Sequence, residues 1–365
     1  MNVLFLTTHV NTGGITSYIL TLGQALVKSG HKVWLVSSGG DCVAQLESVG
    51  IRHVRYDIRT KSEVHPKLWF CLGNLHRLVK KEGINVIHAQ TRVTQVLGAC
   101  LSRLSGVQLV TTCHGFFRPR WFRKMFPCWG FAVIAISKPV ARHLIQDFAV
   151  PENQVHLIVN GIDLDRFIVV SEQQRQSARQ KLQVGGAPLI GIIARLSSVK
   201  GIDVLIKAMP LVLKRLPSVK LLIAGQGPEE ILLKNLTRDL SLTASVHFKN
   251  TSQQTQELLA AFDVFVMPSL MEGLGLSVME AQACGVPVVA SRVGGLVDLV
   301  QEGTSGYLVP ANDPVALADR IIEALESPQQ SRTMAQQARL NIERHFSAET
   351  MVKQTLEVYE QCSCC

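Results

Sequence analysis

Short runs of apolar residues, rich in β-branched side chains, alternate with amphipathic stretches along the first half of the chain. Runs that predict strands lie at residues 3–8, 32–37, 86–89, 109–112 and 133–136, and residues 14–29 have the period of an amphipathic helix. Strands that alternate with helices form parallel sheets with helices on both faces. The first half therefore predicts a doubly wound, Rossmann-like α/β domain.

The alternation starts again in the second half. After a polar helical stretch at 171–182 and a Gly-Gly-Ala-Pro break at 185–188, strand candidates follow at 189–194, 219–224, 264–267 and 286–291, with helical segments such as 202–215 between them. From residue 314 onward the pattern is helical only, with helices expected at 315–325, 329–345 and 348–362. We therefore predict two Rossmann-like α/β domains, residues 1–165 and 166–345, with a helical end.

Composition narrows the class of protein. A chain of 365 residues exceeds what one hydrophobic core supports. Its content of 47% hydrophobic and 18% charged residues excludes a disordered protein. The apolar runs are strand-sized, so no transmembrane helix is expected, and the N-terminus has the pattern of a first strand rather than of a signal peptide. Nine cysteines, an odd number, indicate reduced thiols, and we expect a cytoplasmic protein.

The net charge and the C-terminal residues give little information about function. The net charge of +9 fits nucleic acid, an anionic membrane or a phosphorylated substrate, and composition alone does not choose among them. The cysteine-rich tail, residues 362–365, is spaced too tightly for a tetrahedral zinc site. We expect it to be a frayed end without function.

Glycines and cations occur where predicted strands end. In parallel sheets, ligands bind beyond the carboxyl ends of the strands, where glycines let the backbone approach and helix N-termini attract anions. Gly13 and Gly14 follow the first strand, and Gly225 and Gly227 follow the strand at 219–224. A tight turn would explain either pair equally well.

Two cations lie between the strand at 189–194 and the helix at 202–215. Arg195 offers a planar fork of donors and Lys200 a compact charge, and both suit phosphate oxygens. A solvated basic loop would explain either residue alone. The pair at a strand-to-helix junction favours a diphosphate site.

Residues 268–281 combine glycines with two carboxylates. A strand ends near Pro268, and a helix is expected from Leu276. Between them, the amides around Gly273, Leu274, Gly275 and Leu276 are candidates to bind sugar hydroxyls or phosphate. Glu272 in the loop and Glu280 about one turn into the helix are suited to accept hydrogen bonds from vicinal sugar hydroxyls.

With these residues the chain resembles the retaining GT-B glycosyltransferases of family 4, a group that includes sucrose synthases, bacterial lipopolysaccharide glycosyltransferases and mannosyltransferases. The motifs that carry the resemblance are Glu272-x7-Glu280, Arg195-x4-Lys200-Gly, Gly13-Gly14, Cys113-His114-Gly115 and Asn160-Gly-Ile-Asp163. The resemblance implies a GT-B fold, in which the two domains face each other across a cleft that closes on the donor. It also implies that the C-terminal helix, within residues 346–365, returns to the first domain.

The resemblance also implies roles for individual residues. Arg195 and Lys200 match the clamp on the donor diphosphate, Glu280 the acid that binds the ribose, and Glu272 the residue that orients the donor sugar. His114 matches a histidine near the donor sugar and phosphate, and the Gly13 and Gly14 amides match the loop that approaches the diphosphate. The domain 1–165 would bind the acceptor and the domain 166–345 the nucleotide sugar. The resemblance assigns none of these residues to a metal ion, so neither a cofactor nor an obligatory metal ion is expected.

Residues 116–129 carry four cations among six aromatic residues. Aromatic rings and cations together suit an anionic membrane surface. The stretch therefore predicts peripheral attachment to the inner face of the cytoplasmic membrane, through residues such as Arg120, Trp121, Phe122 and Arg123. A buried loop with packed aromatic rings is the alternative.

We therefore expect an enzyme that moves a hexose-type sugar from a nucleotide-sugar donor to the hydroxyl of a glycan or lipid-linked acceptor, with retention, in lipopolysaccharide, glycolipid or other cell-surface glycan synthesis. Two alternatives stay open: a sugar-nucleotide epimerase, and a noncatalytic protein that binds nucleotide sugars. A nicotinamide oxidoreductase lacks support, because no G-x-G-x-x-G follows the first strand. Nucleic-acid binding rests on net charge alone, and no nucleic-acid partner is expected. The motifs do not identify the base, the sugar or the acceptor.

Overall fold

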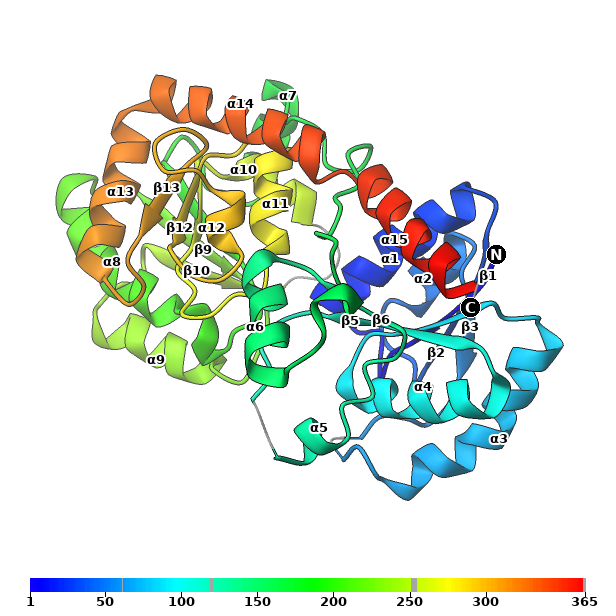
Figure 1. The fold of residues 1–365 in the computed structure, drawn as a ribbon. Coiled ribbons are helices and arrows are strands. Elements are labelled where there is room, and N and C mark those ends of the chain that lie inside the picture. Colours follow the sequence, from blue (N-terminus) through cyan, green and yellow to red (C-terminus); the bar gives the residue numbers. More distant parts are fainter. Residues whose placement is uncertain (61, 119–120, 251–254, 364–365) are drawn as a thin grey trace. The chain divides into compact units, whose positions relative to one another are not determined.

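A computed structural model describes residues 1–60, 62–118, 121–250 and 255–363 of the chain. It divides into two compact units (Figure 1). Unit 1 comprises Met1–Gly161 together with Phe346–Cys365, and unit 2 comprises Ile162–His345. No helix in the described ranges combines the length and the apolar composition needed to span a membrane.

Unit 1 contains a sheet of seven parallel strands in the order β3-β2-β1-β4-β5-β6-β7. The strands are β1 (Asn2–Leu6), β2 (Lys32–Ser37), β3 (Arg52–Arg55), β4 (Val86–Ala89), β5 (Gln108–Cys113), β6 (Ala132–Ala135) and β7 (Val155–Leu157). The central strand β1 is buried from Val3 to Leu6, because both faces of the sheet are covered.

Helices cover the two faces of this sheet. They are α1 (Gly14–Lys28), α2 (Val43–Ser48), α3 (Pro66–Lys81), α4 (Arg92–Ser105), α5 (Trp121–Met125), α6 (Lys138–Phe148) and α15 (Ala348–Ser363), with a 3-10 turn η1 (Glu152–Gln154). Val3 and Phe5 share a core with α1 and α15, whereas Leu4 and Leu6 share one with α3 and α4. The period of two along β1 therefore divides the apolar residues between two cores.

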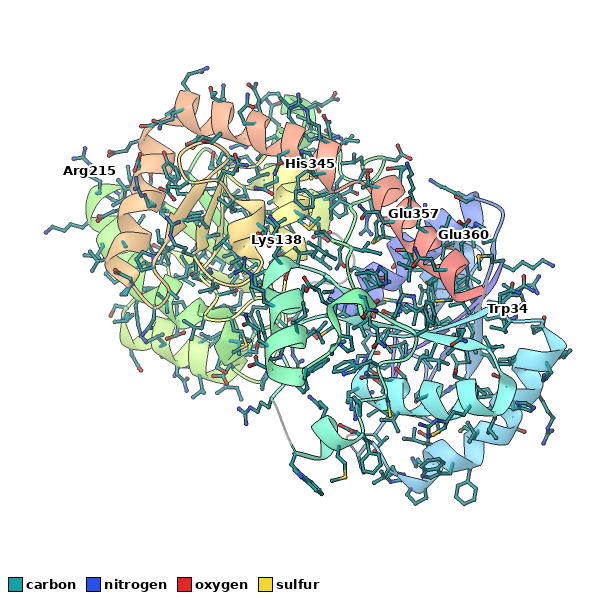
Figure 2. The ribbon with its side chains drawn as sticks, in the orientation of Figure 1. Trp34, Lys138, Arg215, His345, Glu357 and Glu360 are labelled. Atoms are coloured by element: carbon teal, nitrogen blue, oxygen red, sulfur yellow. The ribbon has the colours of Figure 1, made fainter. Side chains whose placement is uncertain are left out.

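The C-terminal helix α15 packs on α1 and on strands β4 and β5 (Figure 1). Its buried face includes Met351, Val358 and Tyr359, while Glu357 and Glu360 lie on the exposed side (Figure 2). The last helix thus completes the core of unit 1.

Unit 2 contains a sheet of six parallel strands in the order β10-β9-β8-β11-β12-β13. The strands are β8 (Leu189–Ile193), β9 (Lys220–Ala224), β10 (Val246–Lys249), β11 (Val264–Met267), β12 (Val288–Ser291) and β13 (Tyr307–Val309). The helices are α7 (Glu172–Lys181), α8 (Ile202–Arg215), α9 (Glu230–Asp239), α10 (Thr255–Ala261), α11 (Leu276–Ala283), α12 (Leu296–Leu299), α13 (Pro314–Glu326) and α14 (Pro328–His345), with a 3-10 turn η2 (Ser198–Lys200).

The predicted pair of doubly wound α/β folds is confirmed, and the predicted element boundaries fall within two residues of the observed ones. The prediction for the cysteine tail was wrong at Cys362, which lies within α15 and is only 2% exposed in the core of unit 1. An apolar thiol at this position adds to the helix's buried face. The last two residues of the tail lie outside the described ranges.

A buried hydrogen-bond pair fastens α15 to the sheet. His88 of β4 is fully buried, and its Nδ1 lies 2.5 Å from the hydroxyl of Tyr359. Replacing Tyr359 by phenylalanine leaves this ring nitrogen without a partner inside the core. We expect Tyr359→Phe to lower the free energy of unfolding of unit 1 by about 1–3 kcal/mol. Native-state hydrogen exchange measures this effect for unit 1 separately, because a chain of two units need not unfold in one step.

Tyr56→Phe serves as the control, because the Tyr56 hydroxyl makes no hydrogen bond within the described part of the chain. Equal exchange protection in both variants would contradict the anchoring role of Tyr359.

Candidate active site

In unit 1, strands β1 and β4 are neighbours, but the helices that follow them lie on opposite faces of the sheet. Helix α1 packs in the core that contains Phe5, and α4 in the core that contains Leu6. A parallel sheet opens a crevice at the carboxyl ends of its strands where the connections diverge in this way. Residues just after β1, β4 and β5 are therefore positioned for a ligand.

Gly13 and Gly14 lie at the start of α1, just beyond β1. Both are exposed, and Gly13 caps the helix with extended backbone and without any side-chain cap. A Cβ atom added to Gly13 would meet only the Asn11 carbonyl, at 3.9 Å. The first amides of α1 are therefore open to an anionic or hydroxyl-bearing ligand.

His114 directly follows β5. Its Nε2 lies 2.9 Å from Oε1 of Gln90, and its ring meets the ring of Tyr18 edge-on with 4.9 Å between centroids. Burial lowers the pKa of His114 from 6.5 to about 3. The imidazole is therefore neutral at physiological pH.

A second histidine supports this region from within the sheet. The Nε2 atom of His88 lies 2.7 Å from Oγ1 of Thr112, which also lies 3.2 Å from the Tyr18 hydroxyl. Burial, and secondarily the proximity of His114, lowers the pKa of His88 to about 3. This network of neutral groups connects the buried faces of α1 and α15 beneath His114.

In unit 2, the strand pair β8 and β11 brings the predicted phosphate and sugar residues together. Lys200 ends the turn after β8, and Glu272 lies in the loop after β11. Their Nζ and Oε2 atoms are 2.5 Å apart, with 21% and 12% of the side chains exposed. Ser269 adds a hydrogen bond from Oγ to the same Glu272 oxygen at 3.2 Å. The carboxylate therefore neutralises Lys200 in a largely buried position.

Arg195 differs from Lys200. Its side chain is exposed, and within the described part of the chain it forms no ion pair or hydrogen bond. Its loop packs against the glycine turn after β9, where Leu196 N donates to Gln226 O at 2.9 Å. A Cβ at Gly225 or Gly227 would lie 1.9 Å from Ala194 O or 2.1 Å from Leu196 O. The two glycines are therefore needed for loop packing.

The loop between β11 and α11 is held by a second glycine pair that the sequence analysis missed. Gly295 N donates to Glu272 O at 3.2 Å, and a Cβ at Gly294 would lie 1.8 Å from that oxygen. Gly294 also has a φ of +50°. Only glycine fits there, and the contact sets the backbone at Glu272. The sequence contained a signal for this glycine pair, because both glycines follow the strand β12.

The predicted backbone ligands around Gly273 occupy the start of α11. Gly275 precedes the helix in the left-handed region, with φ of +105°, and Leu276 is the first helical residue. The side chain of Leu274 is buried, at 2% exposure. Only backbone atoms of Leu274 are thus available to a ligand at this helix end.

Glu280 lies in the second turn of α11. Burial raises the pKa of its carboxyl from 4.5 to about 7, and the charge of Arg166 opposes this shift. Part of the side chain still reaches solvent. Glu280 is therefore close to half protonated at neutral pH, which sets it apart from the ion-paired Glu272.

The described residues contain no cluster of three or more histidine, cysteine, aspartate or glutamate side chains suited to a metal ion. The seven described cysteines are free thiols. The groups available to bind a ligand are therefore neutral imidazole, cations, carboxylates and helix-terminal amides.

The two halves of the chain match two family profiles. Residues 12–166 match Glycosyltransferase Family 4, and residues 173–341 match Glycosyl transferases group 1. The chain is 24% identical to N-acetyl-alpha-D-glucosaminyl L-malate synthase of Bacillus anthracis, over 97% of this chain and 95% of that one. It is 29% identical to a GDP-mannose-dependent alpha-(1-6)-phosphatidylinositol monomannoside mannosyltransferase of Mycolicibacterium smegmatis, over 88% of each chain.

The fold is similar to that of solved glycosyltransferases. The crystal structure of HepE from Anabaena in complex with UDP and glucose matches with a TM-score of 0.88 and 24% identity, over 99% of this chain and all of that one. The expected GT-B fold is therefore confirmed.

Glu280 makes unit 2 sensitive to pH. The pKa in the folded state, about 7, lies above the ordinary 4.5, so the folded state binds the proton more tightly than the unfolded state. The stability of unit 2 should therefore fall as pH rises from about 4.5 to 7. We expect Glu280→Gln to remove this slope and, by pH 8, to be more stable than the wild type by up to about 3 kcal/mol.

Hydrogen exchange in unit 2 at several pH values measures this effect. Glu326→Gln, in a surface ion pair with Arg215, is the control and should keep the wild-type slope. An unchanged slope in Glu280→Gln would refute the assignment.

Proposed function

Since this chain belongs to the GT-B glycosyltransferases of family 4, we propose that it transfers a hexose-type sugar from a nucleotide-sugar donor to an acceptor hydroxyl with retention of configuration. The observation that carries the proposal is the Lys200–Glu272 pair at the carboxyl ends of β8 and β11. It joins a phosphate-binding cation to a hydroxyl-binding carboxylate. A nucleotide sugar presents both groups within one molecule.

The donor would bind to unit 2. The exposed Arg195 and the Lys200 ammonium are suited to the diphosphate, and Glu280 to the ribose hydroxyls. Glu272 and the amides from Gly273 onward would hold the sugar. The HepE complex with UDP and glucose and the GDP-mannose-dependent relative support a nucleotide-sugar donor.

Catalysis would rest on charge stabilisation. As the bond between C1 and the leaving phosphate oxygen breaks, negative charge grows on the diphosphate, where Arg195 and Lys200 oppose it. The acceptor oxygen then bonds to C1 from the same face, and its proton passes to the leaving phosphate oxygen. His114, Gly13 and Gly14 of unit 1 would contact the donor sugar and phosphate, and we propose that no divalent cation is obligatory.

We expect the purified protein, offered UDP-, GDP- and ADP-sugars, to release nucleoside diphosphate only when a lipid or glycan acceptor from a membrane extract is present. Arg195→Ala and Glu272→Ala should each lower kcat/KM by about 100-fold, because each removes a group that meets the donor. Added EDTA should leave the rate unchanged.

Arg215→Ala is the matched control, since Arg215 lies at the far end of α8 and points to solvent (Figure 2). Conversion of the donor to an epimer without diphosphate release would identify an epimerase. Absence of any turnover or donor binding would favour a noncatalytic protein.

We also propose that unit 1 docks on an anionic membrane and takes a lipid-linked acceptor in cell-surface glycan synthesis. The stretch 116–129 divides into two parts. Phe117 and Trp129 pack inward, whereas Trp121 is 73% exposed and Phe126 50% exposed. Arg120 and the Phe122 side chain lie outside the described residues. The buried-loop alternative thus applies to only part of the stretch.

Buried charges hold this exposed loop in place. Arg92 donates to the Phe126 carbonyl at 2.6 Å, and Glu63 pairs with both Arg92 and Arg123. Glu63 comes three residues before α3, whose Phe70 is 84% exposed. We name the exposed rings of Trp69, Phe70, Trp121 and Phe126 the aromatic surface. Exposed aromatic rings in and near a stretch whose sequence is rich in cations are suited to the interface of an anionic bilayer.

Flotation with phosphatidylglycerol-containing vesicles tests the aromatic surface. We expect the protein to float with these vesicles and not with phosphatidylcholine alone, and the double variant Phe70→Ser, Trp121→Ser to bind at least about tenfold more weakly. The control Ile231→Ser, Leu232→Ser, at exposed apolar positions of unit 2, should bind like the wild type. Equal flotation of both double variants would refute membrane docking.

A further inference from the structure

We propose that Gln90 is a positioning residue that fixes His114 as the tautomer protonated on Nε2, so that Nδ1 accepts a hydrogen bond from a hydroxyl of the donor sugar. The part that concerns the sugar rests on the proposed function. The part that concerns the tautomer stands on the geometry of unit 1 alone.

Gln90 lies at the carboxyl ends of the neighbouring strands β1 and β4. It is the first residue after β4, and its backbone N–H donates to Leu6 O of β1 at 2.9 Å. Only 2% of the residue is exposed. Its Oε1 lies 2.9 Å from Nε2 of His114. The side chain is therefore held at the point where a ligand of this sheet is expected.

The pair defines where the imidazole proton lies. A carbonyl oxygen only accepts hydrogen bonds, so His114 Nε2 must carry a hydrogen to bond with it. Burial keeps the ring neutral, with a pKa of about 3, and a neutral ring has a single N–H. Nδ1 is therefore left with a lone pair.

Nδ1 is the nitrogen available to a ligand. Within the described part of the chain it has no hydrogen-bond partner, and it is not among the buried polar atoms that lack one, so it reaches solvent. The Tyr18 ring of α1 contacts the His114 ring, and His88 of β4 lies close enough for His114 to affect its pKa. Neither Tyr18 nor His88 carries a charge at neutral pH. Among the residues that the structure describes, no charged group raises the pKa of His114.

A lone pair at this position selects one kind of ligand atom. A sugar hydroxyl can donate to it, whereas the diphosphate oxygens of a nucleotide sugar carry no proton at neutral pH and would be repelled. His114 would therefore recognise the sugar and leave the diphosphate to other groups. The family resemblance places His114 near both the sugar and the phosphate, and the proposed tautomer assigns it to the sugar.

Gln90 has a feature that a purely structural residue would avoid. Its Nε2 is buried and has no hydrogen-bond partner among the described residues. An unpartnered buried donor disfavours folding, and an apolar side chain of similar shape would remove that cost. Gln90→Leu removes that cost but also leaves His114 Nε2 without its acceptor, so the two effects oppose each other. We therefore expect the variant to fold with a stability close to that of the wild type, which makes it a suitable probe.

Long-range proton–nitrogen NMR of the ¹⁵N-histidine-labelled protein reports the tautomer directly, with His114→Phe to assign the signals. We expect the protonated nitrogen to be Nε2 in the wild type and in Gln95→Leu, a control at a buried glutamine that bonds the Pro127 carbonyl. In Gln90→Leu, signals of the Nδ1–H tautomer should appear. A wild-type His114 protonated on Nδ1, or a tautomer unchanged in Gln90→Leu, would overturn the proposal.

Calorimetric titration with UDP-glucose and with UDP alone tests the ligand assignment. Gln90→Leu should weaken UDP-glucose by about tenfold, the loss of roughly one hydrogen bond, while the affinity for UDP stays unchanged. In the His114→Phe background, Gln90→Leu should have no further effect. An equal loss of affinity for UDP would overturn the sugar assignment. If neither compound, nor any other nucleotide sugar, binds the wild type, the proposed function fails while the NMR result still decides the tautomer.

Discussion

The parallel direction of every strand is the constraint on which the rest of this structure depends. Because the strands of each unit run the same way, all of their carboxyl ends lie along one edge of the sheet. Loops far apart in sequence, such as those carrying Lys200 and Glu272, meet there without any long-range motif to bring them together. The apolar cores then hold this edge in register, since the central strands of each sheet are buried on both faces.

The polar residues of the candidate site differ between the two units in how their charges are balanced. In unit 2, Lys200 and Glu272 compensate each other's charge, which makes their partial burial tolerable. In unit 1, His88 and His114 are kept neutral by burial, and hydrogen bonds rather than charges order them. Unit 2 thus offers groups suited to an anionic donor, and unit 1 offers groups suited to neutral hydroxyls.

The sequence predicted most elements that are buried and periodic. It missed the edge strands β3, β7, β10 and β13, which contain three or four residues each, and of these β3 and β10 carry exposed polar side chains. A strand of three or four residues shows at most two turns of the period-two pattern, which is too short to be told from a loop. The tail was misjudged for a related reason: the pattern around Cys362 did not reveal that the last turn of α15 packs against the core of unit 1.

By itself, the sequence determined the α/β class, the two domains and the motif residues, because period, glycine position and charge are local properties. Only the tertiary structure decided which of these residues pair. Lys200 forms an ion pair with Glu272, whereas burial raises the pKa of Glu280. Gln90 contacts His114, and the Gly294–Gly295 turn contacts Glu272. Distances between loops and the dielectric around a buried group are properties of the folded chain, and no local pattern encodes them.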